Sequence, residues 1–200
     1  MGASEFLDPH NERVYFERTR LYNVGETKEE SRMANTSSVI AAEYLRELES
    51  ESRATRECLE QVPMDQSEWK PHEKSMPLGY LAMMVAEIPK WIQYTIENGE
   101  IDFGTFEHSK IDTTDQLIEA FDINMANVRE ALNGLSDEGL KETFSLKNQG
   151  ELLFSSPKRE SISQSINHLV HHRGQLTVYL KILGKKIPSI YGPSADSQGF

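Results

Sequence analysis

The chain has 200 residues, of which 32 are Asp or Glu and 21 are Lys or Arg, so its formal net charge at pH 7 is -11. An acidic surface repels the phosphates of nucleic acids and anionic lipids, so we expect no nucleic-acid partner and no membrane attachment. The single cysteine, Cys58, cannot form an internal disulfide. The sequence also has neither the apolar run of roughly 18 residues that spans a membrane nor a secretory signal. The composition therefore predicts a soluble, cytoplasmic protein.

The first 32 residues differ in character from the rest of the chain. Residues 1–32 are polar, rich in Glu and Arg, and show no sustained helical period, and Met33 offers a second start. We interpret residues 1–32 as a leader outside the fold, with a natural disordered arm as the alternative. The folded domain is expected over residues 33–200, which is long enough to bury a core without disulfides.

Four stretches of this domain each carry one apolar face with the spacing of an α-helix. Serine, threonine and proline are typical of helix starts, and glycine of helix ends. The first face predicts a buried stripe of Ile40, Tyr44, Leu48, Thr55, Leu59 and Val62. The four stretches run from Ser37 or Ser38 to Pro63, from about Pro77 to Glu97, from Thr114 to Gly134, and from after Ser156 to about Leu183.

The segments between these stretches are expected to be irregular, with one open case. Residues 100–112 are predicted to form a loop, and Pro89 is expected to kink the second helix. Residues 143–154 fit either a short hairpin or an extended loop around a turn. Gly184 is the expected left-handed stop of the last helix, and the tail from Ile187 onward is expected to be irregular. Four amphipathic helices joined in this way predict an all-α protein with a four-helix bundle.

The last helix carries the most informative pattern of the chain. His168 and His172 are four residues apart, so their Cβ atoms lie about 6 Å apart on one face of the helix. Two imidazoles at this spacing can chelate one divalent cation, although such a pair is more often a surface feature than a site. Because the pair borders the apolar stripe, partial burial is expected, and a metal is one way to supply buried imidazoles with partners.

Three neighbouring side chains are weaker candidates for a functional role. His171 points away from His172 and is a poor partner for it. Arg173 is expected to pair with a carboxylate rather than to act on a substrate. Cys58 has no basic partner evident in the sequence, so we expect it to pack in the core or in an interface rather than to act as a nucleophile.

The motif Asn-His-Leu-Val-His-His-Arg-Gly-Gln-Leu at 167–176 resembles the last-helix motif of the DinB-like (damage-inducible) four-helix-bundle superfamily. The segment from Leu183 to Asp196 resembles that family's tail, and the segment from Trp69 to Gly79 resembles its lead into the second helix. The resemblance covers roughly residues 33–196. It implies a homodimer, a role in the stress response and a small-molecule substrate.

The same resemblance implies a divalent-metal site, with zinc or nickel held by three histidines. The pair on the fourth helix carries over onto His168 and His172, but Met84 occupies the place of the histidine from the second helix. A thioether is a weak ligand for zinc or nickel. The site is then metal-free with Met84 as core packing, or binds metal weakly through two imidazoles and water, or is completed by another group such as Glu87 or His72.

Two classes of function remain open at this point. The resemblance implies a metal-dependent enzyme of the thiol S-transferase or hydrolase type, in which the metal lowers the pKa of a bound thiol or water. Without the third histidine, the chain is instead a non-catalytic, metal-free bundle that binds a small molecule. A helical module whose histidine pair is incidental is the weaker third reading.

Overall fold

The structure is a computed structural model, and it describes residues 38–198. The leader predicted for residues 1–32 lies outside the described residues. Four long helices are present, in close agreement with the predicted bounds: α2 (Val39–Leu59), α3 (Leu78–Glu97), α4 (Thr114–Asn133) and α6 (Lys158–Ile182). Two short helices, η1 (Met64–Gln66) and α5 (Asp137–Lys141), join them.

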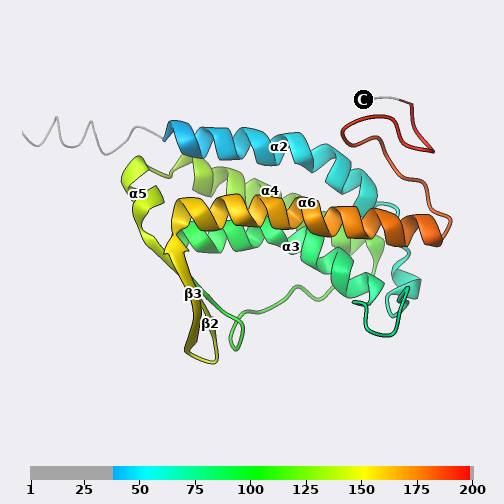
Figure 1. The fold of residues 1–200 in the computed structure, drawn as a ribbon, viewed down its shortest axis with the longest axis horizontal. Helices are drawn as coiled ribbons and strands as arrows, with labels where there is room; N and C mark the ends of the chain where they lie inside the picture. The colour runs from blue at the N-terminus through cyan, green and yellow to red at the C-terminus, as the bar shows by residue number, and fades with distance from the viewer. Residues whose placement is uncertain (1–37, 199–200) are drawn as a thin grey trace, which may run out of the picture. The chain divides into compact units, whose positions relative to one another are not determined.

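The four long helices pack along one another. α3 contacts α4 and α6, and α2 contacts the same two helices from the other side (Figure 1). Leu48 and Leu59 of the predicted stripe on α2 are buried, but Ile40 is 46% exposed, so the prediction is wrong for this residue. Tyr44 is partly buried at the same end of the helix.

The helix ends follow the expected chemistry. Ser38 Oγ accepts hydrogen bonds from the backbone N–H groups of Ile40 and Ala41 at 3.1 and 3.3 Å. The cap of α4 is Thr113, one residue earlier than predicted, and Gln116 completes a capping box with it. Gly184 has a φ of 69°, which is the left-handed stop predicted for the last helix.

A small sheet lies beside the helices, so the prediction of an all-α protein is confirmed only in part. β2 (Thr143–Asn148) and β3 (Glu151–Pro157) form an antiparallel hairpin, which settles the open case in favour of a hairpin. β1 (Glu100–Asp102) pairs in parallel with β2 inside the segment that was predicted to be a loop. Figure 1 shows the hairpin extending away from the start of α6.

Asp102 fastens β1 to the turn of the hairpin. Its carboxylate accepts hydrogen bonds from the backbone N–H groups of Gly104 and Gln149, both at 2.8 Å, and of Gly150 at 2.7 Å. These bonds, the one from Gly104 foremost, lower the pKa of the Asp102 carboxyl. Gln149 and Gly150 both have positive φ, and this conformation lets the turn present its N–H groups to the carboxylate.

A buried ion pair connects α2, α6 and the tail. Arg173 is 1% exposed and lies 2.6 Å from the carboxylate of Glu51. Tyr191 of the tail donates to Glu51 at 2.9 Å and contacts the same guanidinium at 2.8 Å, while Thr55 Oγ1 accepts from Arg173 at 3.1 Å. The prediction that Arg173 pairs with a carboxylate is confirmed.

Candidate functional site

The two predicted histidines of α6 lie side by side and face the interior of the protein. The Nε2 atoms of His168 and His172 are 2.6 Å apart. His172 is only 6% exposed, whereas His168 is half-buried. His171, on the next position of the helix, is exposed. The spacing of four residues therefore brings two imidazoles together, as the sequence predicts, and leaves the third outside.

Gln175 fixes the orientation of His172. Its Oε1 atom lies 2.7 Å from Nδ1 of His172. Because an amide oxygen can only accept, Nδ1 of His172 carries the proton and the lone pair of its Nε2 acts as an acceptor. The proton shared between the two rings then belongs to Nε2 of His168. An outer partner of this kind is typical of histidines that bind metals.

Both imidazoles are uncharged at neutral pH. Burial, together with the neighbouring His172 and His171, lowers the pKa of His168 from 6.5 to about 4. Burial also lowers the pKa of His172, although its hydrogen bond to Gln175 opposes the effect. Neutral imidazole is the form that binds a metal ion or accepts a hydrogen bond, so the pair is ready for either.

The pair fits a metal ion only as a site with two nitrogen donors. Bonds of about 2.0–2.1 Å to a tetrahedral ion would hold two nitrogens about 3.3 Å apart, so the rings would have to separate slightly from their present contact. Within residues 38–198, no group of three His, Cys, Asp or Glu side chains is arranged to hold a metal. Met84 is buried in the wall of a cavity that His168 also lines.

The two other candidate ligands are engaged elsewhere. Glu87 is fully buried on α3, and its carboxylate binds Nδ1 of His108 at 2.7 Å and the backbone N–H of Ser109. His72 is exposed, and its Nδ1 accepts a hydrogen bond from the backbone of Lys74 at 3.2 Å. Neither side chain reaches the histidine pair in this arrangement.

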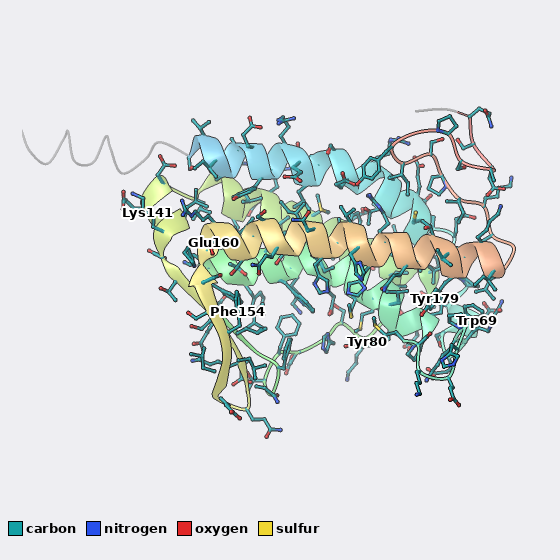
Figure 2. All side chains as sticks on the ribbon, in the orientation of Figure 1. Trp69, Tyr80, Lys141, Phe154, Glu160 and Tyr179 are labelled. Carbon is teal, nitrogen blue, oxygen red and sulfur yellow. The ribbon has the colours of Figure 1, made fainter. Side chains whose placement is uncertain are left out.

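A cavity of about 700 Å³ opens beside His168, between α3, α6 and the small sheet. Its lining is largely aromatic and aliphatic, with hydroxyl and amide groups on the α6 side and no Lys, Arg, Asp or Glu. In Figure 2, Tyr80 and Phe154 mark the side of the helices on which it lies. The lining residues are Tyr80, Met84, Trp91, Thr95, Ile101, Phe103, His108, Phe144, Leu146, Phe154, Ser161, Gln164, Ser165 and His168.

Sequence reasoning missed His108, which also lines this cavity. It stands in the segment between β1 and α4, where no periodic pattern marks it. The only signal was Glu87, a carboxylate on a helix face that is otherwise apolar, since such a group needs a partner. Cys58, by contrast, behaves as predicted: it is fully buried, and burial raises the pKa of its thiol to about 11.

Comparisons with known proteins agree with this architecture. The model of the DinB family matches residues 33–198 of the chain. No curated protein resembles the sequence closely enough to count as a match. Within residues 38–198, no helix has both the length and the hydropathy needed to cross a membrane.

Three solved structures share the fold. A DinB-like protein from Bacillus subtilis is 20% identical with a TM-score of 0.59, and the match covers 78% of this chain and 99% of that one. A DinB-like protein from Bacillus cereus ATCC 10987 is 21% identical with a TM-score of 0.54, covering 74% and 95%. A member of the DinB family from Exiguobacterium sibiricum 255-15 is 18% identical with a TM-score of 0.59, covering 77% and 98%.

Proposed function

The chain belongs to the DinB family, and we propose that it binds an uncharged, largely apolar small molecule in the cavity beside His168. In this proposal the long helices form a four-helix bundle that serves as the scaffold, and His168 and His172 hold at most one divalent ion, weakly. The observation that carries the proposal is the lining of the cavity, which includes His168 but no Lys, Arg, Asp or Glu.

The size and chemistry of the cavity support this class of ligand. A volume of about 700 Å³ is within the usual range for sites that enclose small organic molecules. A charged ligand would lose its hydration there without gaining an opposite charge, which is costly. Aromatic rings from Trp91, Phe144 and Phe154 offer flat contact surfaces. Ser161, Gln164 and Ser165 offer hydrogen bonds that can orient a polar end of the ligand.

A metal-dependent enzyme of the thiol S-transferase or hydrolase type is the second candidate. The contact between Gln175 and His172 favours it, because it directs the Nε2 lone pair of His172 toward His168. A bound zinc or nickel ion would supply a lowered pKa for a thiol or water. The present hydrogen bond between the rings favours the metal-free alternative instead, since it pairs the two Nε2 atoms without an ion.

Ligand binding is tested with N-phenyl-1-naphthylamine, an uncharged apolar fluorophore, in the presence of EDTA. We expect saturable binding of one molecule per chain, weakened by Phe154→Ser because Phe154 lines the cavity. Leu153→Ser is the matched control, because Leu153 is the neighbouring exposed residue and does not line the cavity. Equal loss of binding in both variants, or no saturable binding in the parent protein, would refute the proposal.

A homodimer, a cytoplasmic location and a role in the stress response remain proposals that rest on the family resemblance. The dimer has the most direct test. Sedimentation equilibrium of the full chain is expected to give twice the mass of 22.8 kDa. A single species at the monomer mass over the micromolar range would remove the dimer from the proposal.

A further inference from the structure

Glu87 and His108 form a pair that the binding proposal does not use, and His108 lines the cavity. Glu87 is fully buried on α3, among apolar neighbours such as Val85, Ile88 and Pro89. His108 comes from the segment before α4 and keeps 39% of its side chain exposed. A buried carboxylate is costly unless it is well paired, so the position of Glu87 calls for a physical reason.

The geometry of this pair gives the two ring nitrogens of His108 different roles. Nδ1 lies 2.7 Å from Oε2 of Glu87, and Oε1 of Glu87 accepts the backbone N–H of Ser109. Because a carboxylate oxygen accepts hydrogen bonds, Nδ1 of His108 carries the proton and donates it in a hydrogen bond to Glu87. Nε2 then carries a lone pair and has no hydrogen-bond partner among residues 38–198.

We propose that His108 is a general base for ligands bound in this cavity, and that Glu87 is the residue that positions it. Nε2 accepts the proton of an acidic O–H, S–H or C–H bond of the ligand, and the electron pair of that bond stays on the ligand. The new imidazolium is stabilised by the carboxylate of Glu87 and then releases its proton to water. The inference rests on the proposed ligand cavity but requires no metal ion.

The surroundings of His108 favour proton transfer over a purely structural link. The rings of Phe106 and Tyr80 pack edge-on against the imidazole at centroid distances of 5.3 and 6.5 Å. Tyr80 and Glu87 are the titratable groups of α3 with a ring or hydrogen-bond contact to His108 within residues 38–198. The ammonium group of Lys90 lies 4.7 Å from the centroid of the Phe106 ring. It also donates a hydrogen bond to the backbone carbonyl of Glu107. A purely structural tie would not need the ring to line the cavity.

The test uses 5-nitrobenzisoxazole, an uncharged aromatic molecule whose ring opens when a base removes its C3 proton. The C–H electron pair becomes part of a nitrile, the N–O bond breaks, and the phenolate product is measured by its absorbance. The assay contains EDTA, which removes any contribution from a metal at His168 and His172. We expect saturable turnover by the full chain, and a loss of at least about tenfold in kcat for His108→Gln.

The positioning role of Glu87 has its own readout. Glu87→Gln keeps the shape of the side chain but removes the charge that stabilises the imidazolium, so kcat falls while KM is kept. His72→Gln is the matched control, because His72 is exposed and does not line the cavity, and its turnover is expected to equal that of the parent protein.

The possible outcomes separate this inference from the binding proposal. If His108→Gln turns over 5-nitrobenzisoxazole as fast as the parent protein, His108 is not the general base. The same holds if the parent protein binds N-phenyl-1-naphthylamine but shows no turnover. In both cases the proposed ligand cavity is unaffected. Absence of both turnover and binding overturns both. Circular dichroism of each variant shows whether a lost rate reflects a lost fold. If Glu87→Gln fails to fold, the rate of a folded His108→Gln protein decides the outcome.

Discussion

Arg173 on α6 and Glu51 on α2 form an ion pair of 2.6 Å that is almost completely removed from solvent. Tyr191 of the C-terminal segment bonds to both members. The pair therefore joins two long helices and the tail through one buried contact. Arg173 is directed to α2 by this pair, and it does not line the cavity.

We predict that Arg173→Met destabilises the protein strongly. Removing one partner of a buried ion pair leaves an uncompensated charge, which typically costs about 3–5 kcal/mol. The double variant Arg173→Met with Glu51→Leu should regain much of this loss, because both charges are then absent. Urea unfolding measures both effects. Arg129→Ala, which breaks a solvent-exposed pair with Glu49, is the control and should cost less than about 1 kcal/mol.

Zinc or nickel binding is expected to be weak in the parent protein and tighter in Met84→His. The substitution adds a third nitrogen donor to the wall of the cavity that His168 also lines, so we expect affinity to rise at least about tenfold, or about 1.4 kcal/mol. Calorimetry measures this change. Met83→His is the control, because the neighbouring residue does not line the cavity. Nanomolar affinity in the parent protein would contradict the two-nitrogen site.

In EDTA, the free energy of unfolding should fall as the pH is lowered through the range in which His168 titrates. Its pKa in the folded protein, about 4, lies below the usual 6.5, so the unfolded chain binds more protons between these values. This contribution to stability is present in full above pH of about 6.5 and disappears toward pH 4. In His168→Gln the slope of unfolding free energy against pH should be smaller over this window. Parallel slopes would show that His168 does not titrate as described.

The thiol of Cys58 should be unreactive in the native protein. Its pKa of about 11 leaves roughly a thousandth of it as thiolate at pH 8, and the side chain is fully buried. We expect Ellman's reagent to label it only at the rate at which the protein unfolds. Labelling within seconds in native buffer, without a urea-dependent increase, would place Cys58 in an accessible site instead.

The helices and the histidine pair could be predicted because their signals are local. Ser38 and Gly184 mark ends within one turn of the residues that they cap, and the spacing of His168 and His172 fixes their common face. β1 could not be predicted, because a strand of three residues is stabilised by a partner that begins more than forty residues later.

The same physical limit applies to His108. Nothing in its local sequence distinguishes it from an ordinary loop residue, and its place at the cavity depends on a contact with Glu87 on an earlier helix. Ile40 illustrates the opposite error. Its spacing fits the apolar stripe, but it stands in the first turn of α2, where no neighbouring helix covers that face among the described residues.

The attachment of the hairpin through Asp102 separates two tasks in this molecule. Phe144, Leu146 and Phe154 of the hairpin form one wall of the cavity, whereas His168 and His172 stand on α6. Because the hairpin is held at its turn by Asp102, the residues of that wall can be substituted without altering the arrangement of the long helices. Such a division makes the hairpin a replaceable selector of molecules: a graft of different residues there would change which compounds enter while the reactive groups stay where they are.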